Sequence, residues 1–400
     1  KTTAEVDAWT GVQQIRLGLE QGRIDRLRPG VDAIALEHLM VGTSFSGVPT
    51  WSPHDVRGGT DDDGGGADES YRLLPVAFTG ARPRRRACAQ GERRVVVAVP
   101  DSGLNTHPWF GLREIGDPLP EDGFIQVYEA VGEALRYQAE RLDGLTPTQV
   151  LTSVWEDPLY TDELSQQIGR ATGHFTFIAG RIHQNAPDAD VLAMRVLHPD
   201  NVCYEADLLL ALWMLVARIK QGGHVDVVSL SIGGYVEDDS EAARHLREVV
   251  AELTDLGVVL VAAAGNDSTT RPFYPAALAE DNPLVLGVGA LNPDDTEAWF
   301  SNAGAYVTLE ATGANVLSTF PTSLRGSQGA RLLNGAGTRQ TADPDSFTGG
   351  FAIGSGTSYA APEVAAELAV ALAGCEVGIA IPETASRAER AADAVKRLLT

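Results

Sequence analysis

The sequence has few cysteines for its 400 residues. Cys88, Cys203 and Cys375 are the only three, and they are odd in number and far apart. No two of them have the CxxC spacing of a zinc or redox site, and three thiols cannot form a disulfide framework. We therefore expect unpaired thiols and no cysteine-based metal site. Unpaired thiols favour a cytoplasmic over a secreted location, although the location itself stays unknown from sequence.

Positive charge is also scarce, because 31 lysines and arginines face 54 acidic residues and give a net charge of −23. This balance argues against nucleic acid or an anionic membrane surface as the main partner. No apolar run reaches the roughly 18 to 20 residues that a membrane-spanning helix needs. No signal peptide is visible, but the chain starts at Lys1 without Met, so a leader could have been removed.

The chain divides into three parts by composition. Residues 1–50 are an N-terminal extension that includes the strand-like stretch DAIALEHLMV, 32–41. Residues 51–90 contain RGGTDDDGGGADES, which is too polar to pack and predicts a flexible linker. Residues 91–400 form the main domain. Within it, residues 111–168 show a helical pattern and no strong strand, which predicts a helical insertion on the domain surface.

Five short and nearly continuous apolar runs follow residue 95, at 95–99, 190–197, 225–232, 258–264 and 284–291. Such runs are typical of parallel strands buried on both faces. Helical stretches separate several of them, for example at 205–221 and 240–257. The alternation predicts an α/β fold with a doubly wound parallel sheet flanked by helices.

Polar residues follow two of these strands directly. Asp101 comes after VVVAVP and Asn266 after VVLVAAAG. Each alone is an ordinary turn residue, but ligand and catalytic groups also lie beyond the carboxyl ends of parallel strands. Ser358, in Gly-Thr-Ser at the start of an Ala-rich helix, is locally a helix N-cap or a nucleophile. Among eight histidines, His174 stands out because it lies at a polar loop-to-helix transition beside small and apolar residues.

The order of these residues excludes one class of serine enzyme. An α/β-hydrolase carries its serine before its acid and its histidine, and no histidine follows Ser358. The order Asp101, His174, Ser358 is instead that of the subtilisin triad.

Six segments, in order, resemble the subtilisin-like serine proteases (subtilases, peptidase family S8). They are VVVAVPDSGLNTHP (95–108), GHFTFIAG (173–180), APDADVLAMRVL (186–197), VVSLSIGG (227–234), VVLVAAAGND (258–267) and GTSYAAPEVA (356–365). The resemblance spans about residues 95 to 373. It implies a serine endopeptidase in which Ser358 attacks the peptide carbonyl, His174 takes its proton and Asp101 orients the imidazole. Asn266 would stabilise the oxyanion together with the backbone N–H of Ser358.

The resemblance also implies an extended protein or peptide substrate, held between two pocket walls. One wall is Ser229, Leu230, Ser231, Ile232 and Gly233, and the other includes Ala263 and Gly265. Phe273 falls at the pocket floor, where a ring predicts a preference for small residues before the cut; alternatively it is core packing. The chemistry needs no cofactor and no metal site is assigned. A structural calcium ion, which family members often bind, has no ligands that we can name.

Two features leave alternatives open. Residues 1–50 are either the protease's own inhibitory propeptide or an arm packed on the catalytic domain. Phe175 replaces the glycine that normally follows the catalytic histidine. If that position needs a glycine-only backbone conformation, Phe would strain it or reshape the cleft. The alternative function is then a catalytically impaired pseudoprotease that binds peptides or acts as a scaffold. The sedolisin relatives fit poorly, because they use Glu where His174 stands and Asp where Asn266 stands.

Overall fold

The computed structural model describes residues 39–43, 73–77, 80–87, 93–140, 151, 153–156, 169–199, 201–236, 243–324, 332–334, 337–339, 346–373 and 384–400. Most of the predicted N-terminal extension, the Gly/Asp run at 57–70, Cys88 and Cys375 lie outside these residues. Cys203 is a buried thiol.

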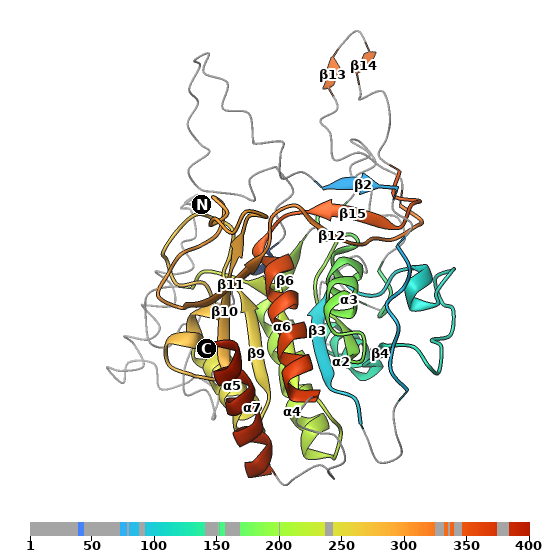
Figure 1. Ribbon diagram of the computed structural model, residues 1–400. Helices are drawn as coiled ribbons and strands as arrows, with labels where there is room; N and C mark the ends of the chain where they lie inside the picture. Colours follow the sequence, from blue (N-terminus) through green and yellow to red (C-terminus); the bar gives the residue numbers. More distant parts are fainter. Residues whose placement is uncertain are drawn as a thin grey trace, which may run out of the picture.

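A seven-stranded parallel sheet forms the centre of the molecule (Figure 1). Its strand order is β11-β10-β9-β7-β3-β5-β4. The strands are β3 (Val96–Asp101), β4 (Ile125–Val127), β5 (Asp190–Arg195), β7 (Val227–Leu230), β9 (Val259–Ala263), β10 (Val285–Leu291) and β11 (Val307–Thr312). The five predicted apolar runs each supply a strand of this sheet, and the predicted α/β class is confirmed.

Helices cover both faces of the sheet (Figure 1). The α-helices are α2 (Glu129–Glu140), α3 (His174–Asn185), α4 (Glu205–Lys220), α5 (Arg244–Asp255), α6 (Thr357–Ala373) and α7 (Thr384–Leu398). The 3-10 helices η2 (Pro108–Phe110) and η4 (Ala276–Glu280) lie in connections that the structure describes. No helix in the described part of the chain is long and apolar enough to span a membrane.

The alternation of side chains along β3 shows how the two cores form. Val97 and Val99 belong to the core shared with α3, α6 and α7. Val96 and Ala98 belong to the core shared with α2, α4 and α5. Because successive side chains of a strand point to opposite faces, a strand between two helical layers needs apolar residues at nearly every position.

Three smaller sheets complete the described part of the fold. The first has the order β6-β1-β8, the second β12-β15-β2, and the third is the pair β13-β14. Their strands are β1 (Leu39–Gly42), β2 (Leu74–Val76), β6 (Val202–Tyr204), β8 (Ile232–Gly233), β12 (Val316–Thr319), β13 (Leu332–Asn334), β14 (Gly337–Arg339) and β15 (Phe351–Gly354).

Two segments differ from the sequence-based expectation. The range 51–90 was expected to be a flexible linker, yet β2 lies within it and pairs with β15, and Arg85 forms a largely buried ion pair with Asp190. The range 111–168 was expected to lack a strong strand, yet it supplies β4 to the edge of the main sheet. With three residues, β4 is too short to give an apolar run that periodicity can detect.

Candidate active site

The four residues predicted to carry the chemistry meet at one edge of the main sheet. Asp101 is the last residue of β3, and Asn266 follows β9 by three residues. His174 is the first residue of α3, and Ser358 is the second residue of α6. Since the strands are parallel, their carboxyl ends lie together, and both helices begin at that same edge.

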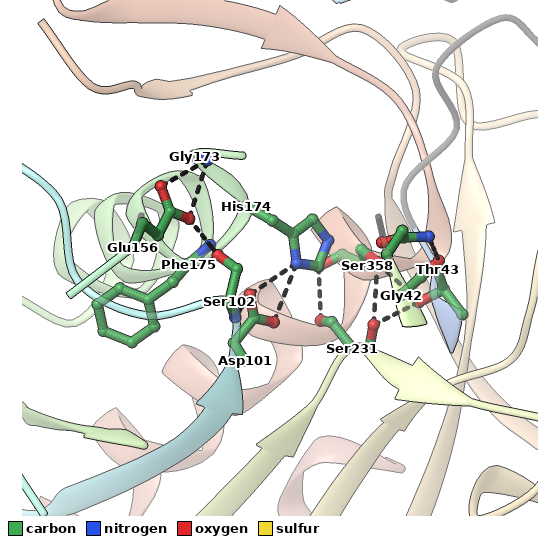
Figure 2. A network of polar contacts seen from close by, with 11 residues as sticks. Gly42, Thr43, Asp101, Ser102, Glu156, Gly173, His174, Phe175, Ser231 and Ser358 are labelled. Atoms are coloured by element: carbon green, nitrogen blue, oxygen red, sulfur yellow. Dashed lines mark hydrogen bonds and ion pairs between the residues drawn. The ribbon is translucent and has the colours of Figure 1, made fainter. Parts of the chain in front are cut away.

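His174 and Asp101 form a buried pair (Figure 2). Nδ1 of His174 lies 2.8 Å from Oδ1 of Asp101 and 3.0 Å from Oδ2. The carboxylate is fixed in turn by the backbone N–H of Ser102, which donates to Oδ1 at 2.7 Å. Nε2 of His174 is buried and has no hydrogen-bond partner among the described residues. This imidazole therefore has its carboxylate-facing nitrogen engaged and its other nitrogen available for a proton.

Ser358 lies against Thr43, the residue that directly follows strand β1. Its Oγ lies 2.7 Å from Oγ1 of Thr43 and 3.4 Å from the carbonyl oxygen of Ser231. Its backbone N–H donates to the carbonyl oxygen of Thr43 at 3.1 Å. The hydroxyl of Ser231 donates to the carbonyl of Ser358 at 2.9 Å.

Asn266 directs its side-chain N–H to the same carbonyl oxygen of Thr43. Thr357 holds the amide of Asn266 in this orientation. The Oδ1 atom of Asn266 accepts hydrogen bonds from both the backbone N–H and the hydroxyl of Thr357, each at 2.9 Å. One carbonyl oxygen thus receives two donors, Asn266 Nδ2 and Ser358 N. These are the two groups that the resemblance assigns to the oxyanion.

Strand β1 and Thr43 form a bound segment, residues 39–43, which lies in a slot between β6 and β8. It pairs antiparallel with β6 on one side and with β8 on the other. The backbone N–H of Thr43, directly after β1, donates to the carbonyl of Ser231 at 3.0 Å. An extended segment of the chain therefore lies between two strand edges, and its last described carbonyl points at the two donors (Figure 2).

The predicted pocket residues fall into two groups. Ser231, Ile232 and Gly233 contact β1 and Thr43 through their backbones. Ser229, Leu230 and Ala263 lie inside strands, and their side chains are fully buried away from solvent.

Phe273 occupies the space between the two predicted walls and is only 1% exposed. A Cβ added to Gly233 would lie 2.3 Å from its Cε1, and a Cβ added to Gly265 would lie 3.2 Å from its Cγ. Gly265 also has a φ of 101°, a backbone conformation that favours glycine. The ring therefore touches the backbone of both walls and leaves little depth between them.

Phe175 is not strained, contrary to the sequence-based concern. It is the second residue of α3 and does not have a positive φ. Its side chain is fully buried in the core that β3 shares with α3, α6 and α7. A helical residue needs no glycine, because the α region is open to all side chains.

Sequence reasoning missed Glu156, which belongs to the predicted insertion. Its buried carboxylate accepts hydrogen bonds from Ser102 and Gly173 (Figure 2). It also accepts one from the side chain of Asn105. Burial raises its pKa, whereas these hydrogen bonds and the charge of Arg195 act in the opposite direction. No motif signals this role, because the contact depends on where the insertion returns to the domain. The occupation of the slot by Thr43 was also missed, although 32–41 had been noted as strand-like.

Among the described residues, no group of three or more His, Cys, Asp or Glu side chains is placed to hold a metal ion. A structural calcium ion stays a prediction without assigned ligands. The arrangement itself has the parts of acyl transfer: a hydroxyl, an imidazole backed by a carboxylate, and two N–H donors on one carbonyl.

Comparison with known proteins relates residues 92–388 to the model of the subtilase family, Peptidase_S8. Thermitase of Thermoactinomyces vulgaris is 34% identical over 157 residues, 38% of this chain and 48% of that protein. Subtilisin BL of Lederbergia lenta is 31% identical over 240 residues, 57% and 67%. The major intracellular serine protease of Bacillus subtilis is 32% identical over 163 residues, 37% and 47%.

The chain thus spans about half the length of thermitase and of the intracellular protease. Among solved structures, a cold adapted subtilisin-like serine proteinase matches with a TM-score of 0.45 and 19% identity, over 74% of this chain and 83% of that one.

Proposed function

This chain belongs to the subtilase family, and we propose that it is a serine endopeptidase that hydrolyses peptide bonds in proteins. The hydroxyl of Ser358 attacks the carbonyl carbon and passes its proton to Nε2 of His174. Asp101 keeps the imidazole oriented and stabilises its positive charge. Asn266 Nδ2 and the Ser358 N–H stabilise the oxyanion. As the C–N bond breaks, His174 returns the proton to the leaving amine, and water then hydrolyses the acyl-enzyme in the same way.

One observation carries this proposal: the carbonyl oxygen of Thr43 accepts from both Ser358 N and Asn266 Nδ2. A carbonyl in that position is the group that the chemistry requires. The antiparallel pairing of β1 with β6 and β8 supports binding by strand addition, in which main-chain hydrogen bonds hold the substrate.

The bound segment also indicates the first substrate. We propose that residues up to Thr43 act as a propeptide and that the enzyme cuts its own Thr43–Ser44 bond. The predicted extension ended near residue 50, and the contact of Thr43 with Ser358 supports the earlier boundary. The other alternative, an inert arm packed on the domain, does not account for a carbonyl directed at two N–H donors.

We propose further that the enzyme prefers small residues before the cut. Phe273 lies between Gly233 and Gly265 and shortens the pocket. Thr43, a small residue that is itself 3% exposed, occupies this position in the bound segment.

Two measurements test the function together. The full chain is incubated and its N-terminus is followed by mass spectrometry, and the same protein is treated with a fluorophosphonate probe. We expect a new N-terminus at Ser44 and covalent labelling, both lost in Ser358→Ala. A Ser346→Ala variant, at an exposed serine, should still label. An intact, unlabelled wild-type chain would contradict the proposal and favour the peptide-binding pseudoprotease.

The cytoplasmic location predicted above stays a prediction. The name of the Bacillus subtilis relative, an intracellular serine protease, supports it. Fractionation of cells that express the chain, with detection of the full-length and the cut form, would test it.

A further inference from the structure

Glu156 comes from the end of the predicted insertion and is locked beside the end of β3. The backbone N–H of Leu104 donates to the carbonyl of Val154 at 2.8 Å, and the N–H of Glu156 donates to the carbonyl of Leu104 at 2.9 Å. The side chain of Arg195 donates to the carbonyl of Ser153 at 3.3 Å. The segment 153–156 is therefore fixed to the main sheet, and the side chain that it delivers is only 5% exposed.

The carboxylate of Glu156 joins the residues on both sides of the Asp101–His174 pair. It accepts from the hydroxyl of Ser102, the neighbour of Asp101. Both of its oxygens lie 3.0 Å from the backbone N of Gly173, the neighbour of His174. The hydroxyl of Ser102 in turn accepts from the N–H of Phe175 at 3.1 Å.

These contacts satisfy two buried backbone N–H groups at the start of α3, those of Gly173 and Phe175. Gly173 precedes the helix with a φ of 77° and has no side chain that could cap it. The first N–H groups of a helix have no partner within it, and an anion near a helix N-terminus is stabilising. Glu156 supplies both the acceptor and the charge from a distant part of the sequence.

The site requires an acceptor without a proton. Ser102, Asn105 and Gly173 all donate to Glu156. An ionised carboxylate only accepts, so it suits three donors. An amide of the same size would turn an N–H₂ group towards one of them and leave that donor buried without a partner, which is costly.

We propose that Glu156 is a positioning residue: its carboxylate fixes the start of α3 to the end of β3, so that Nδ1 of His174 stays directed at Asp101. The inference rests on the proposed peptidase activity. It assigns the insertion a part in the reaction, although Glu156 itself touches no reacting atom. A misplacement of about 1 Å in a catalytic group can cost about a hundredfold in rate.

The test starts from the full chain and allows self-cleavage to go to completion. The rate of peptide hydrolysis is then divided by the concentration of active sites, which is titrated with a fluorophosphonate. We expect Glu156→Gln to lower kcat about a hundredfold, with KM within twofold of wild type, because substrate binding by β6 and β8 is unaffected. Glu156→Asp, which keeps the charge, should retain at least tenfold more kcat than Glu156→Gln. Glu121→Gln, at an exposed acid of the same insertion, is the matched control and should match wild type.

A purely structural role would reduce the number of titratable sites and leave kcat per site unchanged, and that result would overturn the inference. If Glu156→Gln fails to fold, Ser102→Ala removes a single hydroxyl of the same network and should lower kcat about tenfold; an unchanged kcat there would overturn it equally. A wild-type chain that neither labels nor hydrolyses peptide refutes the proposed function itself. An active wild type with an unaffected Glu156→Gln refutes only the role of Glu156.

Discussion

The side-chain oxygen of Thr43 lies 2.7 Å from the side-chain oxygen of Ser358. The hydroxyl that is proposed to attack is thus engaged by the residue whose carbonyl it would attack. Nε2 of His174, the proposed proton acceptor, has no partner among the described residues. The bound segment therefore keeps the hydroxyl of Ser358 in a hydrogen bond with the hydroxyl of Thr43.

Removal of the Thr43 hydroxyl should therefore speed self-cleavage. Thr43→Val keeps the shape and removes a hydroxyl that contacts Ser358 and also donates to the carbonyl of Ser231. Loss of the contact with Ser358, which is worth about 1 kcal/mol, should make cleavage of the Thr43–Ser44 bond about fivefold faster. The first-order loss of the intact chain after refolding measures this. Thr43→Ser keeps a hydroxyl and should behave like wild type. A valine variant slower than the serine variant would show that the contact assists cleavage.

Phe273→Ala should widen the range of accepted residues. Removal of the ring opens space between Gly233 and Gly265, and apolar side chains in a fitted pocket gain about 1–3 kcal/mol. We expect kcat/KM for a peptide with Leu before the cut to rise at least tenfold relative to one with Thr. Phe124→Ala removes another fully buried ring elsewhere in the core and serves as the control for lost stability. An unchanged Leu-to-Thr ratio would mean that Phe273 is core packing alone.

Acid should destabilise the fold through His107. Burial lowers the pKa of His107 from 6.5 to about 4, although its hydrogen bond to the carbonyl of Gly350 opposes the shift. As pH falls below 6.5, the unfolded state binds a proton that the folded state does not. Stability is therefore complete above pH 6.5 and is lost down to about pH 4, by up to about 3 kcal/mol.

Urea unfolding of the inactive Ser358→Ala protein between pH 7.5 and 4.5 measures this effect. The additional substitution His107→Gln should make the pH dependence shallower, while substitution of the exposed His245 should not. Burial also lowers the pKa of His183, to about 3, so a part of the pH dependence remains in both variants. Equal slopes in the His107 and His245 variants would contradict the assignment.

Breaking the ion pair of Arg93 and Asp226 should be strongly destabilising. The two side chains are 14% and 9% exposed and form two hydrogen bonds, at 2.6 and 2.7 Å. Asp226 also accepts from the backbone N–H of Val96, the first residue of β3. Asp226→Asn removes the carboxylate charge from this buried pair and should cost about 3 kcal/mol of unfolding free energy.

A matched exposed pair gives the comparison. On the surface of α5, Nη1 of Arg244 lies 3.0 Å from Oε1 of Glu248, and the two residues are four positions apart in the sequence. Glu248→Gln should cost no more than about 0.5 kcal/mol. Similar losses in the two variants, measured by urea unfolding, would mean that burial adds nothing to the Arg93–Asp226 pair.

The sequence was sufficient for five of the seven strands of the central sheet and for the meeting of Asp101, His174, Asn266 and Ser358. Buried parallel strands need continuous apolar runs, and a residue at the carboxyl end of such a strand has its location fixed by the fold. Both facts can be read locally.

Other features are not local. The path by which 153–156 returns to the end of β3 depends on long-range packing, so no pattern around Glu156 could signal its contacts. β4 was not predicted because a strand of three residues is too short to show a periodic pattern of apolar residues. Phe175 was judged against a motif glycine, whereas its conformation is set by α3, which begins one residue earlier.

The slot between β6 and β8 accepts a chain only as a strand that bonds on both of its edges. A helix or a compact loop cannot present its backbone in that form, since its N–H and C=O groups are already paired or turned inward. A folded target of the proposed activity must therefore open locally before it can enter. The rate of its digestion then follows the population of its opened state. The activity of this peptidase on a folded protein would therefore report how often that protein unfolds locally.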